Sequence, residues 1–347
     1  MKENGGKRGR NPSLHDVAKK AGVSAASVSR VLNKVNPTSE RLRSRVQAAV
    51  DALGYVPKNA QEVETGKMLG VISYDLRNPY FCEIITGIQD RAVVFGLTPM
   101  ILDLQCGHAE WESVRAAAAA LDCKGYVFLG TGVAEHDLAE FAAQAGTPVV
   151  AVNQAIRHPS IRTINIDYEK ATYAAAQHLL GLGHRRVGFL GGSPSSPVSV
   201  EKIRGVQVAM TEAGLELPAA NVIYGAATVE WGFQAMNSLL ARPEDSRPTA
   251  VLCACDVIAL GVLHALRSAQ LSVPGDVSVV GFDDIDMACH SNPPLTTISP
   301  PKYDMGRRAV DLLLARDDPQ SSPITEYVMI ESPLVVREST GACPRER

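Results

Sequence analysis

Two short amphipathic segments joined by a glycine, within residues 13–32, constrain the start of this chain most strongly. Apolar residues recur at helical spacing in the first segment, at Leu14, Val17, Ala18 and Ala21. Ser13 precedes them and is a favoured N-terminal cap. Gly22 supplies a turn, and Ser24 can cap a second helix that runs to about Leu32. The pattern predicts a helix-turn-helix.

The second helix has a small, almost uncharged outer face. The residues on the side that must pack inward are Val23, Val28, Val31 and Leu32. The residues predicted to face outward are Ala25, Ala26, Ser27, Ser29 and Arg30. Such a face lets a helix approach base edges in the DNA major groove. An ordinary amphipathic helix pair is the alternative interpretation.

Charge is divided unevenly along the chain. Residues 1–60 carry 12 Lys+Arg and 4 Asp+Glu, whereas the remaining residues carry 22 Lys+Arg and 33 Asp+Glu. A basic head therefore precedes an acidic body. A basic module attracts phosphate and an acidic body repels it. Residues 1–11 combine Lys and Arg with Gly and Asn, which is typical of a disordered basic arm or a solvated chain end.

Length and composition narrow the class of protein. The 347 residues suit a small module followed by a large one, and a hydrophobic content of 46% is ample for a buried core. No apolar run is long enough to span a membrane, and the polar, basic N-terminus lacks an apolar signal segment. These features predict a cytoplasmic protein without a membrane partner.

The cysteines argue against a disulfide framework. They number seven and are scattered, at positions 82, 106, 123, 253, 255, 289 and 343. An odd, scattered set is typical of reduced thiols in the cytoplasm. Cys253 and Cys255 alternate within an apolar run, so we expect them in a core strand and predict no metal and no cofactor.

From residue 68 onwards, apolar strands alternate with helices. The expected strands are 68–75, 98–105, 125–130, 147–153, 185–192, a short one around 222, 249–256 and 277–284. The expected helices are 80–96, 110–121, 135–145, 168–182, 198–213, 231–240 and 257–269. This alternation predicts an α/β body with two doubly wound parallel sheets.

Polar residues follow several of these expected strands. They are Asp75, Asn153, Ser193, Asp256 and Asp283. In open α/β sheets, ligands bind beyond the carboxyl ends of the strands. We therefore expect these side chains to border a binding cleft.

Seven segments, taken in order, resemble the LacI/GalR family of bacterial regulators. They read DVAKKAGVSAASVSRVLN, ALGYVPKNA, DLRNPYF, LGHRRVGFLGG, CDVIALGVL, VPGDVSVVGFDD and PPLTTI. The resemblance implies a helix-turn-helix head and a two-lobed body similar to periplasmic binding proteins. It implies a transcriptional regulator, expected to be a repressor, that binds a pseudo-palindromic DNA operator as a homodimer. A small-molecule effector, expected to be a sugar or related metabolite, would bind between the lobes.

The resemblance also implies domain boundaries. The expected parts are the arm 1–11, the DNA-binding domain 12–57, a hinge linker 58–68, the effector-binding and dimerisation domain 69–340 and a tail 341–347. The first lobe is expected at about 69–165 and 298–327, and the second at about 168–292 and 332–340. Three crossings between lobes are expected near 165–168, 292–300 and 327–332.

Site residues follow from the same resemblance. It implies DNA contacts at Ser24, Ala25, Ala26, Ser27, Ser29, Arg30, Asn33 and Tyr55. It implies effector contacts at Asp75, Asn78, Tyr80, Phe81, Asn153, Ser193, Lys202, Asp256 and Asp283. Arg30 can donate two hydrogen bonds to guanine, whereas serines and Asn33 suit phosphate oxygens. A phosphate contact is the alternative role for Arg30, and a contact between lobes is the alternative for each cleft residue.

The chain departs from the family pattern at the hinge and in the cleft. The linker reads AQEVETGK, where Val63 is flanked by Glu62 and Glu64, so we do not expect an apolar wedge in the minor groove. Lys202 stands where the family has an arginine, and Lys lacks the planar fork of Arg. Cys255 stands in place of an asparagine, and Trp231 is the nearest candidate for a missing stacking aromatic.

Three other functions were weighed against an effector-controlled regulator. An enzyme is disfavoured because the chain has no G-x-x-x-x-G-K-[ST], H-E-x-x-H or G-x-S-x-G motif. A transport binding protein is disfavoured by the basic head. A regulator of the same family controlled by a protein partner, with a vestigial cleft, remains the alternative because of Lys202 and Cys255.

Overall fold

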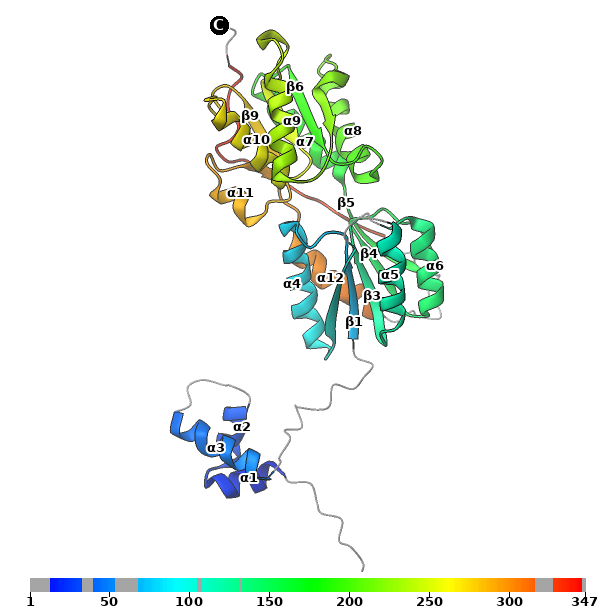
Figure 1. The fold of residues 1–347 in the computed structure, drawn as a ribbon, viewed down its shortest axis with the longest axis vertical. Coiled ribbons are helices and arrows are strands. Elements are labelled where there is room, and N and C mark those ends of the chain that lie inside the picture. Colours follow the sequence, from blue (N-terminus) through cyan, green and yellow to red (C-terminus); the bar gives the residue numbers. More distant parts are fainter. Residues whose placement is uncertain are drawn as a thin grey trace, which may run out of the picture. The chain divides into compact units, whose positions relative to one another are not determined.

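The structure, a computed structural model, describes residues 13–32, 40–53, 68–104, 108–130, 133–315 and 327–344. The chain divides into two compact units, Met1–Thr65 and Gly66–Arg347. We call them the head and the body. Figure 1 shows three helices in the head and two sheets with their covering helices in the body.

The head contains α1 (Leu14–Ala21), α2 (Ala25–Leu32) and α3 (Glu40–Leu53). Ser13 and Asp16 form a capping box at the start of α1. The Asp16 amide donates to the Ser13 hydroxyl, and the Ser13 amide donates to the Asp16 carboxylate. Gly22 ends α1 with a left-handed φ of 64°. The predicted helix-turn-helix is therefore confirmed.

A small apolar cluster holds the three head helices together. Its buried members are Val17, Ala18, Ala21, Val28, Val46 and Ala49. Arg45 of α3 adds a polar tie, because its guanidinium donates to the carbonyl oxygens of Ala21 (2.7 Å) and Gly22 (3.2 Å). These bonds satisfy carbonyls that the end of α1 leaves without helical partners.

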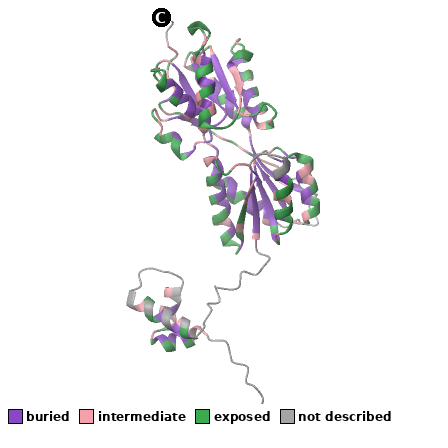
Figure 2. Cartoon of the chain, viewed as in Figure 1, coloured by how far each residue is buried: buried purple, intermediate pink, exposed green. Residues whose placement is uncertain are grey.

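The first lobe of the body is built on a six-stranded parallel sheet, in the order β11-β5-β4-β3-β1-β2. Its strands are β1 (Met68–Ser73), β2 (Thr98–Asp103), β3 (Cys123–Leu129), β4 (Val149–Val152), β5 (Ile161–Ile166) and β11 (Tyr327–Ile330). Its helices are α4 (Pro79–Val94), α5 (His108–Ala119), α6 (Glu135–Ala145) and α12 (Lys302–Leu314). Figure 2 shows that the strands are mostly buried, as expected for a sheet covered on both faces.

The second lobe repeats this plan in the order β12-β10-β9-β8-β6-β7, and only the pair β10–β12 is antiparallel. Its strands are β6 (Val187–Gly191), β7 (Val222–Tyr224), β8 (Ala250–Cys253), β9 (Ser278–Phe282), β10 (Thr296–Ile298) and β12 (Leu334–Val335). Its helices are α7 (Tyr168–Gly181), α8 (Pro197–Glu212), α9 (Val229–Leu240), α10 (Asp256–Ser268) and α11 (Asp286–His290). The predicted fold class, a helical head with a two-lobed α/β body, is confirmed.

The chain passes between the lobes three times, at residue 167, at 299–301 and at 331–333. The second crossing begins later than the expected range 292–300, because Thr296–Ile298 forms a strand of the second sheet. Within the described residues, no helix has the length and apolar character that crossing a membrane requires.

Glycines allow three helix pairs of the body to pack backbone to backbone. A Cβ on Gly87 of α4 would collide with the Tyr303 carbonyl of α12, and one on Gly306 of α12 would collide with the Ile84 carbonyl of α4. Gly232 and Gly261 make the same kind of contact between α9 and α10, as does Gly205 between α8 and α7. Each pair is therefore expected to move as one unit.

Candidate functional site

The N-terminus of α2 carries the predicted DNA contacts that the structure describes. Ser24 is exposed and caps the helix, since its Oγ accepts the Ser27 amide at 3.1 Å, and the two hydroxyls lie 2.9 Å apart. Ala25 was expected to face outward, but it is half-buried against the apolar cluster of the head. The first turn of α2 therefore lies closer to the core than the helical pattern suggests.

The side chains of the other predicted DNA contacts, apart from Ser27, lie outside the described part of the chain. Ala26, Ser29 and Arg30 belong to α2, but their side chains lie outside the described part of the chain. Asn33, Tyr55 and the hinge residue Val63 also lie outside the described residues.

In the first lobe, the start of α4 and the end of β4 meet. The Asn78 side chain caps α4 by accepting the Tyr80 amide at 3.0 Å. The Asn153 side-chain amide donates to the Tyr80 hydroxyl at 2.7 Å, and its own Oδ1 is buried with no hydrogen-bond partner. Phe81 packs edge-on against the Tyr80 ring, with ring centroids 5.2 Å apart. Asn153 also has a left-handed φ of 64°. Strained backbone of this kind in non-glycine residues clusters at functional sites.

In the second lobe, Lys202 of α8 is buried among aromatic rings and backbone. Its ammonium donates to the Ala254 carbonyl at 2.7 Å and lies 3.6 Å from the Phe282 ring centroid and 5.0 Å from that of Tyr168. Burial lowers the pKa of Lys202, and the nearby Asp283 carboxylate acts against that shift. A carbonyl, two aromatic rings and the Asp283 carboxyl group thus surround the Lys202 side chain, and each of them favours its charged form against the effect of burial.

Asp283 follows β9 and faces this cluster. Burial raises its pKa to about 8, while Lys202 and Lys302 act in the opposite direction. Its charge in turn raises the pKa of the Tyr80 hydroxyl in the first lobe, although burial is the larger cause there. Residues of the two lobes therefore face each other at a contact that we call the seam. Tyr80 and Asn153 belong to its first-lobe side, and Lys202 and Asp283 to its second-lobe side. Each of the four is no more than 6% exposed.

Asp256, a predicted effector contact, bonds to two neighbouring segments of the second lobe. Its carboxylate accepts the Thr297 hydroxyl at 2.6 Å and the Ile285 amide at 2.9 Å, and the residue is fully buried. Burial raises its pKa to about 7. These bonds show that Asp256 holds β10 and the loop after β9 in place.

Two predicted cleft residues, the half-buried Asp75 and the exposed Ser193, bond to their neighbours in sequence. Asp75 is ion-paired with Arg77, with an Oδ1–Nε distance of 2.9 Å. Ser193 is exposed and lies 2.8 Å from the Ser195 hydroxyl. Trp231, the candidate stacking aromatic, lies in the first turn of α9 and packs closely against Gly225.

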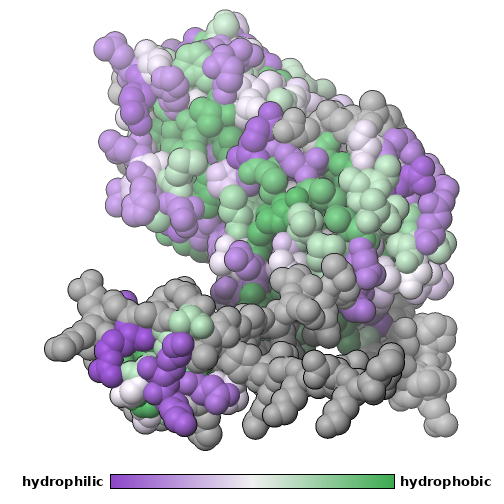
Figure 3. All heavy atoms as spheres, turned by 60° about the horizontal axis from the view of Figure 1, so that its bottom comes forward, coloured by the Kyte–Doolittle hydropathy of each residue, from purple (hydrophilic) through white to green (hydrophobic). Residues whose placement is uncertain are grey.

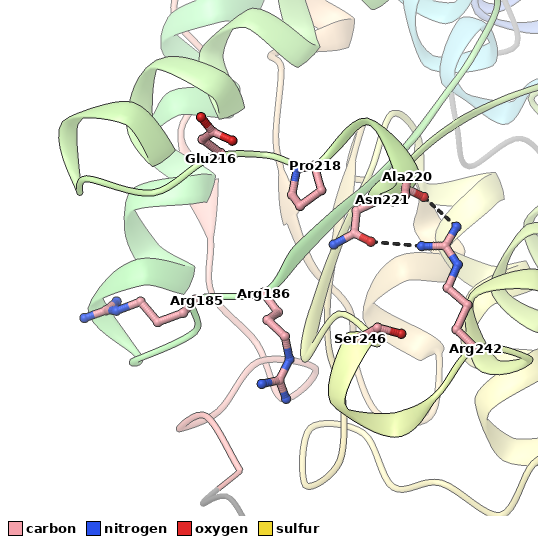
Figure 4. Close-up of a pocket in the computed structure, with 8 residues that line it drawn as sticks. All are labelled: Arg185, Arg186, Glu216, Pro218, Ala220, Asn221, Arg242 and Ser246. Atoms are coloured by element: carbon pink, nitrogen blue, oxygen red, sulfur yellow. Dashed lines mark hydrogen bonds between the residues drawn. The ribbon is translucent and has the colours of Figure 1, made fainter.

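A separate hollow of about 490 Å³ lies at the other end of the second sheet (Figure 4). Its lining residues are Arg185, Arg186, Glu216, Pro218, Ala220, Asn221, Arg242 and Ser246. The Arg242 guanidinium bonds to the Asn221 side chain and the Ala220 carbonyl, and Arg186 Nε donates to the Arg247 carbonyl. These arginines tie loops together at the edge opposite the interlobe seam.

Comparison with known proteins identifies both parts of the chain. Residues 13–58 match the pattern of bacterial regulatory proteins of the lacI family, and residues 176–340 match the periplasmic binding protein-like domain. The HTH-type transcriptional repressor CytR of Escherichia coli (strain K12) is 33% identical over 336 residues, which cover 96% of this chain and 97% of CytR. The chain belongs to the LacI family. It is a transcriptional regulator with a helix-turn-helix head.

Other LacI-family proteins show the same extent of similarity. Catabolite control protein A of Priestia megaterium is 30% identical, over 87% of this chain and 92% of its own. The structure of the regulator CelR with cellobiose has a TM-score of 0.70 at 30% identity and covers 94% of this chain and 99% of CelR. The lac repressor dimer, bound to operator and the anti-inducer ONPF, has a TM-score of 0.71 at 28% identity, over 96% and 100% of the two chains.

The sequence interpretation missed three residues of the seam in this LacI-family chain. Tyr168 and Phe282 provide the aromatic rings around Lys202. Each fits the ordinary apolar pattern of its helix or strand, so the sequence gives no separate sign of a role at the seam. Lys302 is the third, and it is buried at the first residue of α12. A lysine at a helix N-terminus interacts unfavourably with the helix dipole. Its position alone could therefore have indicated that the Lys302 ammonium is stabilised by partners outside its helix.

Proposed function

We propose that this protein is a repressor that binds a pseudo-palindromic operator as a homodimer and responds to a small-molecule effector held between its lobes. The observation that carries the proposal is the convergence of Tyr80 and Asn153 with Lys202 and Asp283 across the seam. Because these side chains are almost fully buried, an effector reaches them only when the lobes separate. Binding would then change the balance of lobe arrangements, as linkage requires.

The chemistry of the seam favours a ligand rich in hydrogen-bond donors. Asn153 Oδ1 is a buried acceptor without a partner, and Asp283 adds carboxylate oxygens. Tyr80 accepts from Asn153, so its hydroxyl proton remains to be donated. Hydroxyl groups of a carbohydrate or related metabolite meet these needs. The effector contacts proposed from sequence at Asn78, Phe81, Ser193, Asp75 and Asp256 would position these groups or the surrounding loops.

The proposed DNA contacts lie on α2 and at the residues that follow it. Ser24 and Ser27 present hydroxyls at the N-terminus of α2, where backbone amides also suit phosphate. Arg30 is proposed to read a guanine, and Ala25 and Ala26 to leave room for bases. Such a regulator acts in the cytoplasm, where bacterial DNA lies, and needs no catalytic step.

A surface of the first lobe supports the dimer. Exposed hydrophobic residues gather where the end of α4 meets the edge strand β2, at Val93, Val94, Phe95, Met100 and Ile101. In Figure 3, hydrophobic side chains gather in patches on the visible face of the body. Apolar patches of this kind mark interaction surfaces, and a symmetric copy of the chain would cover both patches at once.

The proposal is tested by combining ligand screening with DNA binding. Operator fragments are first selected from genomic DNA, and a panel of sugars, sugar phosphates and nucleosides is screened by thermal shift. We expect at least one compound to raise the melting temperature and change operator affinity. Asp283→Asn should abolish that change and leave operator binding without the compound intact. If no compound alters operator affinity, control by a protein partner becomes the better explanation.

A further inference from the structure

Lys302 connects the two lobes with a single buried ammonium group. It is the first residue of α12, directly after the second crossing, and its side chain is 5% exposed. Its Nζ donates to the carbonyl oxygens of Asp283 (2.7 Å) and Asp284 (2.8 Å) and lies 3.2 Å from Glu83 Oε2. Glu83 belongs to α4 of the first lobe, whereas Asp283 and Asp284 follow β9 of the second.

The loop that Lys302 holds has an unfavourable backbone. Asp283 has φ 115° and Asp284 has φ 52°, and two consecutive non-glycine residues with positive φ need support from their surroundings. The Asp284 carboxylate provides part of that support by accepting Arg337 Nη2 at 2.7 Å and Ser299 Oγ at 2.8 Å. Lys302 adds to that support by binding both carbonyl groups of the loop from the first lobe.

The other end of this contact is rigid. Lys302 and Glu83 stand on α12 and α4, whose backbones touch at Gly87 and Gly306. A displacement of Lys302 therefore moves both helices together. Because Tyr80 lies at the start of α4, the same displacement changes the position of a seam residue.

We propose that Lys302 is the latch of the body, a positioning residue that keeps the lobes closed by holding the Asp283–Asp284 carbonyls against the α4–α12 pair. The proposal rests on the proposed function only in taking the Asp283 carboxylate as part of the effector site. The backbone of Asp283 would then hold the lobes together while its side chain meets the effector. An effector that moves Asp283 would act directly on the latch.

Pulsed electron–electron resonance on the full chain tests the latch without effector or DNA. Spin labels are attached at His136→Cys on α6 and Asn237→Cys on α9, two exposed positions in different lobes. Serine replaces Cys82, Cys289 and Cys343, which are not buried, and also Cys106, which lies outside the described residues. Labelled chains are diluted with unlabelled chains of the same variant, so that only distances within one chain contribute.

We expect a narrow interlobe distance distribution for the parent chain and a broader one for Lys302→Met, which keeps the length of the side chain and removes its donors. Lys170→Met is the matched control, because Lys170 forms an exposed ion pair with Glu331 near another crossing. It should leave the distribution unchanged. A distribution for Lys302→Met that equals that of the parent chain would overturn the proposal.

Glu83→Gln keeps the test decisive if Lys302→Met does not fold. Glu83 is about half exposed, so its replacement is tolerated, and we expect a smaller broadening in the same direction. An unchanged distribution for Glu83→Gln, together with unfolded Lys302→Met, would assign Lys302 to stability alone. Failure of the effector screen would count against the proposed function and leave this distance test untouched.

Discussion

The Asn153 side-chain amide donates a 2.7 Å hydrogen bond to the Tyr80 hydroxyl, which joins the end of β4 to the first turn of α4. Both residues are buried, and Asn153 Oδ1 has no partner of its own. The bond fixes the direction in which the free lone pairs of Asn153 point. Several consequences for stability and binding can be measured.

Tyr80→Phe should destabilise the body. It removes the acceptor of the Asn153 amide, and a buried donor without a partner costs about 1–3 kcal/mol. Urea unfolding followed by circular dichroism measures the loss. Tyr173→Phe is the control, because the Tyr173 hydroxyl bonds to Glu212 at the surface, where water can replace it. Equal losses in both variants would show that the buried bond contributes little.

Gly306→Ala should separate α12 from α4. The added methyl group would collide with the Ile84 carbonyl, and such overpacking costs about 1–3 kcal/mol or more. Gly181→Ala is the matched control, since Gly181 ends α7 with no neighbour near its missing Cβ. There, replacing glycine should be neutral or stabilise by up to about 1 kcal/mol. A neutral Gly306→Ala would mean that the helix pair yields easily.

The stability of the body should fall as pH rises from about 7 to about 8. Burial raises the native pKa of Asp283 to about 8 and that of Asp256 to about 7, well above the ordinary aspartate value. At these two groups the native chain therefore binds more protons than the unfolded chain, and unfolding becomes easier as pH rises. Burial lowers the pKa of His178 and of His184, which has the opposite effect at lower pH, so the fall in stability belongs to the range in which the histidines are mostly neutral in both states. The slope reaches at most about 1.4 kcal/mol per pH unit for each group.

Asp283→Asn isolates the contribution of Asp283 to this pH dependence. Denaturant midpoints measured across the same window should vary less with pH in this variant than in the parent chain. Asp286→Asn, at an exposed residue of α11, should keep the parent slope. A stability that rises with pH in the parent chain would contradict the raised pKa values.

Arg30→Ala should weaken operator binding by about 1–3 kcal/mol and relax the preference for one guanine, if Arg30 reads a base. Fluorescence anisotropy on operator and on random DNA separates the two roles. Equal weakening on both DNAs would assign Arg30 to a phosphate. In either case, affinity should fall steeply with salt, because the basic head neutralises phosphates.

Phe95→Glu should shift the proposed homodimer towards monomer. The substitution places a charge in the exposed apolar surface formed by α4 and β2, where burial of apolar area would be lost. Light scattering over a dilution series measures the dimer dissociation constant. Val200→Glu, which changes a similarly exposed valine on α8, is the control. A dimer unaffected by Phe95→Glu would place the interface elsewhere.

Hydrophobic periodicity predicted the long elements of this fold well. Buried parallel strands such as β1 and β9 are continuous apolar runs, and most predicted helices begin or end within a few residues of the observed bounds. The strands β5, β10, β11 and β12 were not predicted. β10 and β12 are only three and two residues long, and their place depends on the crossings between lobes and not on local pattern.

The candidate site was predicted less completely than the fold. Strand-end positions drew attention to Asn153 and Asp283, and both lie near Tyr80 because topology brings such ends together. Their contacts with an effector stay predictions. The same argument pointed to Asp256, whose carboxylate oxygens accept hydrogen bonds from Thr297 and Ile285 and whose part in the effector site stays a prediction. It could not find Lys302, because its partners are backbone carbonyls distant in sequence, and no residue pattern encodes them.

The two final strands have a consequence for biosynthesis. β11 completes the first sheet at one edge and β12 completes the second, although only residues 331–333 separate them. Ser339 and Gly341 then bond to the backbone or side chains of Val279, Thr296 and Ser278. During translation, neither lobe can finish folding before this last segment leaves the ribosome. The two lobes should therefore complete their folding together once this segment has emerged, and not one after the other.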